Sequence, residues 1–365
     1  MKWIKNIILA GFATILILMA IEFSVRFFYD SVAPFSFEEW MESKPKALQN
    51  DPDYDIVLKG FNGKCRYPIP IFENKVSAYE KDWSCGEVTV SNGKRLTKPE
   101  PDAWTKTIHI FGGSTVWGRG ALDDKTIPSY IQASLKNKNI RVLNYGMMSF
   151  VSLQQTEVLR AQSSEIQKGD IVIYNDGWND FYNSVMYGNP DGFIVGFNNQ
   201  NKLQIYRYLI TSYLHREVYT YRFISDLIKG NKRPTNDMEC ATSYETAKNR
   251  IEGSALNLAN RIREAKKLTE SLDASFIHFY QPTLLDSKDL TNYEAEIMSQ
   301  YPCMRVARPL KHQYNKEFLE VSKESIDQTD LLIGTDLFFD YSHTAAEGNK
   351  IIADNILKVL LNNEY

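Results

Sequence analysis

The sequence predicts an α/β protein in which a parallel sheet lies between two layers of helices, a three-layer α/β/α sandwich. Two observations support this fold class. Short apolar stretches that suit buried strands alternate with longer segments of helical spacing through most of the chain. In addition, residues 170–174 (Asp-Ile-Val-Ile-Tyr) are apolar on both faces, which is typical of a parallel strand covered by helices.

The predicted elements follow in order along the chain. We expect strands at residues 107–111, 141–144, 170–174 and 275–280. We expect helices at residues 127–135, 152–167, 255–272 and 345–361, where apolar residues recur at helical spacing. Residues 282–332 are mixed in pattern. The aromatic-rich segment from Phe181 to Asn236 fits no pattern and is interpreted as an insertion over the functional site.

The N-terminal residues 1–28 are expected to form a transmembrane anchor. Lys2 and Lys5 precede an uncharged run from Ile7 to Ile21, and the largely apolar stretch extends from Trp3 to Phe28. That length is sufficient for one span, which needs about 20 mostly apolar residues. No small-residue cleavage site closes the stretch, so an uncleaved anchor is favoured over a signal peptide. The lysines favour a cytoplasmic N-terminus, which places the rest of the chain outside the cytoplasm.

Two further regions follow the anchor. Residues 29–105 are irregular and are expected to form a stalk and a small N-terminal extension, with short strands between residues 54 and 95 that pack on the main domain. Residues 106–362 are expected to form that main domain. The chain has 365 residues, of which 43% are hydrophobic, and this is enough for a large core. The net charge of −3 and the lack of a basic block argue against a nucleic-acid partner.

The four cysteines, Cys65, Cys85, Cys240 and Cys303, lack the C-x-x-C spacing of a zinc site. Their even number fits two disulfides in an oxidising compartment, in agreement with the predicted topology. Order along the chain suggests the pairs Cys65–Cys85 and Cys240–Cys303, although four cysteines allow three pairings. The alternative is that all four are buried free thiols.

Residues that suit ester chemistry follow the predicted strands. Ser114 follows the first strand, Gly146 the second and Asn179 the third, whereas Asp340 and His343 precede the last helix. Ligands bind such sheets at the carboxyl ends of the strands, so these residues are expected to meet there. Taken singly, each fits an ordinary turn or cap at least as well as a functional site, and only their joint arrangement favours a site.

The residue types suggest a catalytic triad with an oxyanion hole. A serine hydroxyl needs a base to become a nucleophile, and His343 is the candidate base, oriented by Asp340. Three donors are candidates for binding the oxyanion: the N–H groups of Ser114 and Gly146, and the side-chain amide of Asn179. The strand-to-helix elbow of α/β-hydrolases is excluded, because Val116 stands where that elbow requires glycine.

These blocks resemble the SGNH hydrolases, also called GDSL-type esterases, over about residues 91–361. The nucleophile block stands as Gly112-Gly113-Ser114 in place of Gly-Asp-Ser, a departure that keeps the nucleophile. Gly146 corresponds to the second block, Gly177-x-Asn179-Asp180 to the third and Asp340-x-x-His343 to the fifth. Residues 91–95 and 118–126 also resemble membrane-anchored bacterial members. The segment from Phe181 to Phe276 has no counterpart, which leaves substrate specificity open.

The resemblance implies a flavodoxin-like fold and hydrolysis of small acyl esters, often acetyl groups on an envelope or exported glycan. The implied partner is an acylated small molecule or glycan, without a metal or organic cofactor. The implied location is a bacterial inner membrane, with the catalytic domain in the periplasm. Two alternatives stay open: an O-acyltransferase that uses the same acyl-serine, and a non-catalytic glycan-binding or assembly protein on this fold.

Other polar and aromatic residues are interpreted more simply. His109 and His278 lie within predicted strands and are expected to be core or sheet-face residues. Four aromatic residues near the proposed site suit either a sugar-stacking floor or core packing, namely Trp117, Trp178, Tyr182 and Tyr187.

Overall fold

The computed structural model describes residues 14, 16–24, 47, 71–72, 78–192, 243–299 and 301–362. The chain divides into two units. The first consists of residues 1–42 with 197–236, and the second consists of residues 43–196 with 237–365.

In the first unit, residues 16–24 are helical, and their apolar side chains are exposed, Phe23 by 73%. Among the described residues, no helix combines the length and the apolar character that a membrane crossing requires. Most of the predicted anchor lies outside the described residues, so the anchor stays a prediction.

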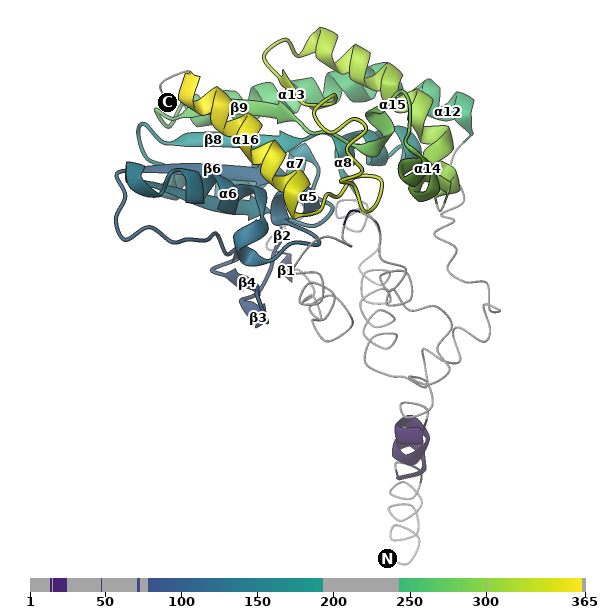
Figure 1. The fold of residues 1–365 in the computed structure, drawn as a ribbon, viewed down its shortest axis with the longest axis horizontal. Helices are drawn as coiled ribbons and strands as arrows, with labels where there is room; N and C mark the ends of the chain where they lie inside the picture. Colours follow the sequence, from purple (N-terminus) through teal and green to yellow (C-terminus); the bar gives the residue numbers. More distant parts are fainter. Residues whose placement is uncertain are drawn as a thin grey trace, which may run out of the picture. The chain divides into compact units, whose positions relative to one another are not determined.

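The second unit is built on an eight-stranded sheet with the strand order β10-β9-β8-β6-β7-β5-β4-β3 (Figure 1). The strands β6 to β10 run parallel, in the order along the sheet β10, β9, β8, β6, β7. Their bounds are β6 Lys106–Gly112, β7 Ile140–Gly146, β8 Ile171–Asp176, β9 Ser275–Tyr280 and β10 Ile326–Asp327. The strand β6, which leads to Ser114, is therefore central and pairs on both sides.

Three short strands extend this sheet in the antiparallel sense, so the expectation of a parallel sheet is wrong at this edge. They are β3 Trp83–Cys85, β4 Val88–Ser91 and β5 Lys94–Arg95. The turn between β4 and β5 explains their direction, because Asn92 (φ 52°) and Gly93 (φ 69°) both adopt the left-handed conformation of a two-residue hairpin. The short strands expected between residues 54 and 95 thus include strands of the main sheet. A separate pair is formed by β1 Ile71–Phe72 and β2 Ala78–Tyr79.

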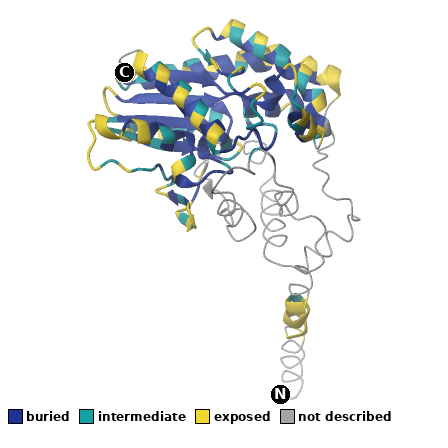
Figure 2. Cartoon of the chain, in the orientation of Figure 1, coloured by how far each residue is buried: buried dark blue, intermediate teal, exposed yellow. Residues whose placement is uncertain are grey.

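Helices flank the sheet on both faces. Ile108 and Ile110 of β6 belong to one apolar cluster with side chains of α6, α15 and α16, whereas Phe111 belongs to a second cluster with α7 and α13. Consecutive strand residues point to opposite faces, so these clusters lie on the two sides of the sheet. Figure 2 shows the strands buried and the outer sides of the helices exposed. The α-helices of the second unit are α5 Ser114–Trp117, α6 Ile127–Ser134, α7 Ser152–Ala161, α8 Trp178–Phe181, α12 Tyr244–Lys248, α13 Ile251–Glu270, α14 Asn292–Ser299, α15 Pro302–Val321 and α16 Ala346–Asn362.

Each predicted strand and helix of the main domain has an observed counterpart, but the sequence pattern misses most of the structure between residues 282 and 332. That region contains α14, α15 and β10, none of which the sequence pattern indicates. The helix α15 begins at Pro302 and has Pro309 in its interior. Proline suits the first turn but normally breaks a helix interior, so these two residues obscure a helical pattern of 20 residues.

Two of the four cysteines lie in the described part of the chain. Cys85 and Cys303 are each disulfide-bonded, and no described cysteine is free. Cys65 and Cys240 lie outside the described residues, so the pairing Cys65–Cys85 and Cys240–Cys303 stays a prediction.

Candidate active site

Ser114 is the first residue of α5, directly after the central strand β6 and Gly113. Its side chain is half-buried, which keeps the hydroxyl accessible from the rim of the sheet. A Cβ on Gly113 would lie 2.5 Å from Nδ2 of Asn179. The glycine therefore allows the Asn179 amide to approach the backbone beside Ser114.

The loop before α16 brings His343 and Asp340 to Ser114. The Ser114 Oγ lies 2.6 Å from Nε2 of His343, and Nδ1 of His343 lies 2.7 Å from Oδ2 of Asp340. The other carboxylate oxygen of Asp340 accepts the backbone N–H groups of Ser342 and His343, both at 2.8 Å. A hydroxyl, an imidazole and a carboxylate thus form one chain of hydrogen bonds, the arrangement that activates a serine for acyl chemistry.

The ionised form of Asp340 is stabilised although the carboxylate is buried. Burial alone would raise the pKa of Asp340, but the attraction of His343, their hydrogen bond and the charge of Arg119 outweigh it and lower this pKa to about 2. The carboxylate is therefore ionised near neutral pH and stabilises the positive charge that His343 gains when it takes the serine proton.

Two of the three predicted oxyanion donors are available at the nucleophile, namely the N–H of Ser114 itself and the Asn179 amide, which lies against Gly113. The N–H of Ser114 is in the first turn of α5, where helical N–H groups have no acceptor within the helix. The Nδ2 of Asn179 donates to the Phe150 carbonyl at 2.9 Å. This bond uses one N–H of the amide and leaves the second for an oxyanion.

Gly146 is engaged in a different way from the predicted one. Its N–H donates to Oδ1 of Asn144 at 2.9 Å and would have to leave this partner to bind an oxyanion. A Cβ on Gly146 would lie 2.2 Å from the backbone nitrogen of Trp117 in α5. Nδ2 of Asn144 also donates to the Val116 carbonyl at 2.9 Å. Gly146 and Asn144 therefore hold α5, and with it Ser114, against the end of β7.

Ser149 is a further candidate oxyanion donor that the sequence interpretation omits. It is exposed, has a φ of 62°, and its N–H donates no hydrogen bond to a described residue. Its neighbours contact the site, since the Met147 N–H donates to the Gly112 carbonyl at 3.1 Å and Phe150 accepts from Asn179. A serine rarely adopts a positive φ, so the sequence holds no signal for this conformation.

Asp180 supports the loop that contains these donors. Its carboxylate accepts the N–H and the hydroxyl of Ser152 at the start of α7, at 3.0 and 2.6 Å, and lies 3.7 Å from Nη1 of Arg261. Burial, and then the negative charge of Asp176, raise the pKa of Asp180 to about 7. Asp180 therefore connects α7, through Ser152, to α13, through Arg261, and Arg261 also donates to the more exposed Asp191 at 2.7 Å.

The four aromatic residues noted in the sequence do not form one cluster. Trp178 lies 5.3 Å from both Tyr182 and Tyr341, measured between ring centroids. Trp178 and Tyr182 are only 5% and 7% exposed, which favours core packing over a sugar-stacking floor. Trp117 lies apart from them and packs against Arg95 and Trp83 instead.

The two histidines expected in the sheet are buried there. Nε2 of His109 lies 3.2 Å from Oδ2 of Asp170, and Nε2 of His278 lies 3.0 Å from Oδ1 of Asp176. Both are less than 2% exposed, so neither lies beside Ser114 as a second base.

No family model and no curated protein matches this chain. Similar solved structures include a member of the lipolytic protein G-D-S-L family from Veillonella parvula, with a TM-score of 0.37, 12% identity and coverage of 70% of this chain and 99% of that chain. They also include a catalytic mutant of Axe2, an acetylxylan esterase from Geobacillus stearothermophilus. Its TM-score is 0.36 at 13% identity, and the match covers 70% of this chain and 94% of that chain. Likeness of this degree does not assign a function, which has to come from the geometry of the site.

Proposed function

We propose that this chain is a serine esterase of the SGNH type that removes small acyl groups, foremost acetyl groups, from an envelope or exported glycan. One observation carries the proposal: the Ser114 hydroxyl, the His343 ring and the Asp340 carboxylate are connected by hydrogen bonds of 2.6 and 2.7 Å. This continuous relay from nucleophile to base to carboxylate suits acyl transfer and argues against a purely binding role.

The proposed reaction has two halves. The Ser114 oxygen attacks the ester carbonyl while His343 takes the hydroxyl proton, and the N–H of Ser114 and the Asn179 amide bind the resulting oxyanion. His343 then gives the proton to the leaving sugar oxygen, and the C–O bond to the sugar breaks. In the second half, water attacks the acyl-serine and His343 accepts its proton. The acid is released, and the proton returns to the Ser114 oxygen.

The decisive experiment compares Ser114→Ala with Ser134→Ala in the full chain, purified in detergent. Ser134 is exposed on α6 and donates to the Tyr130 carbonyl at 3.0 Å, so it is a suitable control. We expect Ser114→Ala to abolish the release of p-nitrophenol from p-nitrophenyl acetate and labelling by a fluorophosphonate probe, whereas Ser134→Ala keeps both. Full activity of Ser114→Ala would exclude the mechanism.

The same acyl-serine also allows transfer to a sugar hydroxyl. Product analysis with and without a glycan acceptor distinguishes the two outcomes, because a hydrolase releases free acetate in both cases. An acyltransferase requires the acceptor for turnover.

We further propose that the protein is a single-pass inner-membrane protein with its N-terminus in the cytoplasm and its catalytic domain in the periplasm. Lys2 and Lys5 before the apolar stretch support this orientation, as do the disulfide-bonded Cys85 and Cys303. A fusion of alkaline phosphatase after the last residue should be active in a bacterial host. A second fusion at the same position carries green fluorescent protein. If this second fusion is fluorescent and the alkaline phosphatase fusion is inactive, the proposed orientation is wrong.

A further inference from the structure

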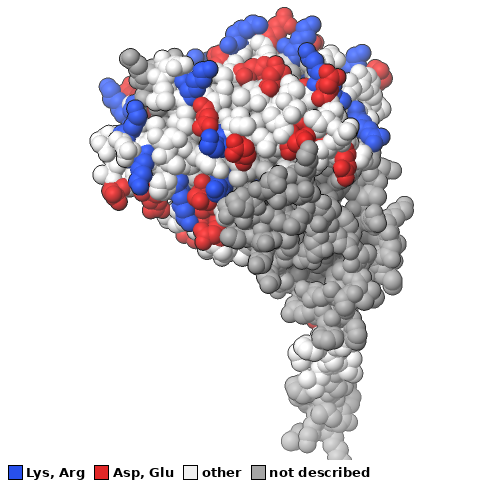
Figure 3. All heavy atoms as spheres, viewed as in Figure 1, with Lys and Arg blue, Asp and Glu red and all other residues white. Residues whose placement is uncertain are grey.

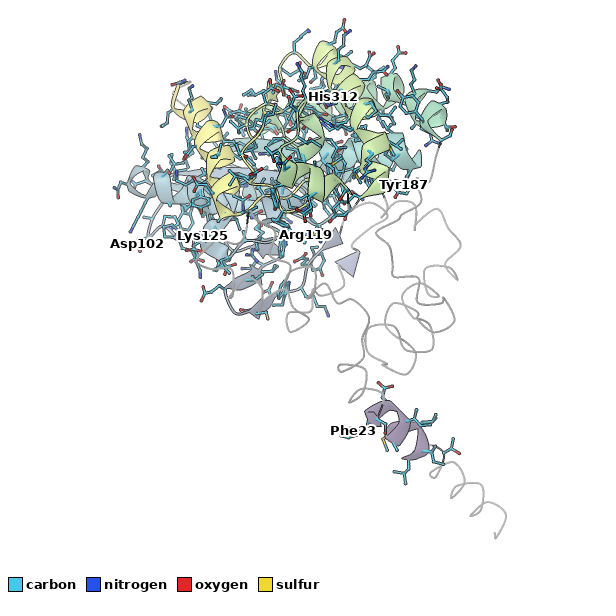
Figure 4. The ribbon with its side chains drawn as sticks, turned by 45° about the vertical axis from the view of Figure 1, so that its right-hand side comes forward. Phe23, Asp102, Arg119, Lys125, Tyr187 and His312 are labelled. Atoms are coloured by element: carbon cyan, nitrogen blue, oxygen red, sulfur yellow. The ribbon has the colours of Figure 1, made fainter. Side chains whose placement is uncertain are left out.

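Arg119 occupies a fixed position beside the proposed triad. It follows α5 directly, and its N–H donates to the Ser114 carbonyl at 3.0 Å. The next residue, Gly120, packs so closely on Phe339 that an added Cβ would lie 2.6 Å from the ring. Phe339 in turn donates its N–H to the His343 carbonyl at 3.0 Å. The backbone of Arg119 is therefore held between the nucleophile and the loop of the base, and Figure 4 shows it at the edge of the second unit.

The charge of the Arg119 guanidinium acts on the surroundings of the triad. It contributes to the lowered pKa of Asp340, and it opposes the rise that burial causes in the pKa of Tyr301 and of Tyr341. Asp340 is the one carboxylate among these three groups, and both of its oxygens are already used by His343 and Ser342. The guanidinium charge thus acts on the triad, while the Asp340 carboxylate is already hydrogen-bonded to His343 and Ser342.

The side chain of Arg119 is half-buried and makes no ion pair or hydrogen bond with a described residue. Comparable half-buried arginines are satisfied: Arg250 donates to the Val185 carbonyl at 3.2 Å, and Arg308 donates to the Ser287 carbonyl at 3.1 Å. A guanidinium has five N–H donors and is costly to bury without acceptors. Within the described ranges of the chain, no acceptor occupies the donors of the Arg119 guanidinium.

The chemistry of the group indicates which ligand it suits. A guanidinium binds carboxylate and phosphate groups through two parallel hydrogen bonds. Basic and acidic side chains are interspersed on the face shown in Figure 3, so on that face no broad basic patch attracts anions. The charge of Arg119 acts on two tyrosines, Tyr301 and Tyr341, whose rings pack edge to face at 4.9 Å between centroids. Such rings provide a surface on which a sugar ring can pack.

We propose that Arg119 binds an anionic group, a carboxylate or a phosphate, on the acylated sugar, so that the preferred substrate is an ester of an acidic saccharide. The inference rests on the proposed esterase function and specifies its substrate class. The anionic group would lie near the ester that Ser114 attacks, because the Arg119 N–H donates to the Ser114 carbonyl and the guanidinium charge acts on Asp340.

The test compares matched esters with the full chain. The substrates are an acetylated methyl glucuronoside, an acetylated glucose 6-phosphate, the neutral acetylated methyl glucoside and p-nitrophenyl acetate. We expect kcat/KM to be higher for at least one anionic sugar than for the neutral sugar. Arg119→Gln should lower kcat/KM for that anionic sugar by about 10- to 100-fold more than it lowers kcat/KM for p-nitrophenyl acetate, as is typical for the loss of a charged hydrogen bond. The kcat/KM of Arg119→Lys should lie between the values of the unaltered protein and Arg119→Gln. The anionic sugar with the higher kcat/KM identifies the bound group as a carboxylate or a phosphate.

The control is Arg160→Gln, because Arg160 is exposed in the last turn of α7, where it pairs with Glu264 at 2.8 Å, and should have no effect on any substrate. An equal loss on all four esters in Arg119→Gln would overturn the inference, since Arg119 would then act through Asp340. Equal kcat/KM for neutral and anionic sugars in the unaltered protein would overturn it as well. If p-nitrophenyl acetate is not hydrolysed, the esterase proposal itself fails. Calorimetric binding of the anionic sugars to Ser114→Ala, with and without Arg119→Gln, then still decides the role of Arg119.

Discussion

Asp340 holds His343 at two points. Oδ2 of Asp340 lies 2.7 Å from Nδ1 of the imidazole, and Oδ1 accepts the backbone N–H of the same histidine at 2.8 Å. The ring can therefore neither rotate nor exchange its tautomer without breaking a bond to a buried carboxylate. The orientation of the base depends on a residue only three positions before it.

Asp340→Asn is expected to lower kcat for p-nitrophenyl acetate by about 10,000-fold, as in other triads, because an amide at this position favours the wrong imidazole tautomer. Asp354→Asn is the control, since Asp354 is exposed on α16 and pairs with Lys350 at 2.9 Å. Steady-state hydrolysis measures both. More than a tenth of the original kcat in Asp340→Asn would show that His343 does not need this carboxylate.

The same carboxylate makes stability depend on pH. Its pKa is lowered from 3.8 to about 2 on folding, so the unfolded chain binds more protons in this interval. The stabilisation is complete above pH 3.8 and is lost as the pH falls through about 2. Urea unfolding at a series of pH values should show that the free energy of unfolding falls more steeply with decreasing pH in the unaltered protein than in Asp340→Asn. The two proteins share all other carboxylates. Parallel curves of the free energy of unfolding against pH would therefore show that Asp340 does not cause the pH dependence.

Asn179→Ala is expected to lower kcat by about 100- to 1000-fold with little change in KM, because the lost amide binds charge that develops only in the transition state. The exposed Asn137, next to α6, provides the control Asn137→Ala. Initial rates over a range of ester concentrations separate kcat from KM. An increase in KM alone would instead assign Asn179 to substrate binding.

Two glycines are expected to respond to alanine in opposite ways. In Gly146→Ala, the new Cβ would lie 2.2 Å from the backbone of Trp117, so we expect a lower melting temperature and a displaced α5 with loss of activity. In Gly253→Ala, on α13, nothing lies within 4 Å of the new Cβ. There the better helix propensity should raise stability by about 0.5 to 1 kcal/mol. Thermal unfolding followed by circular dichroism measures both, and equal effects would contradict the packing described for β7.

The sequence pattern predicts those parts of the fold that depend on local order. The strands β6, β8 and β9 are apolar runs, and Ser114, Asp340 and His343 stand next to recognisable element ends. The structure brings these three residues together across 229 positions of sequence separation between Ser114 and His343. The sequence predicts this meeting because the strands of a parallel sheet end, and the helices that follow them begin, at one carboxyl edge.

The features that the pattern misses depend on contacts between distant segments. Lys311 lies on α15 and is fully buried against Asp286 at 3.1 Å, although a lysine in a helix ordinarily indicates a solvated face. The positive φ of Ser149 and the engagement of Gly146 by Asn144 are likewise set by their surroundings rather than by residue type. Such features require the three-dimensional neighbours, which periodicity does not contain.

The antiparallel strands at the margin of the sheet have a practical consequence. The outer side of β7 pairs with β5 through Asn144 and Arg95, and the Arg95 guanidinium lies 3.1 Å from Asp123, with both side chains at most 1% exposed. A shortened protein that begins at Lys106 would leave an unpaired strand and an uncompensated buried negative charge. Bare strand margins recruit other chains, so this protein would be expected to aggregate, whereas one that retains residues 78–105 would not.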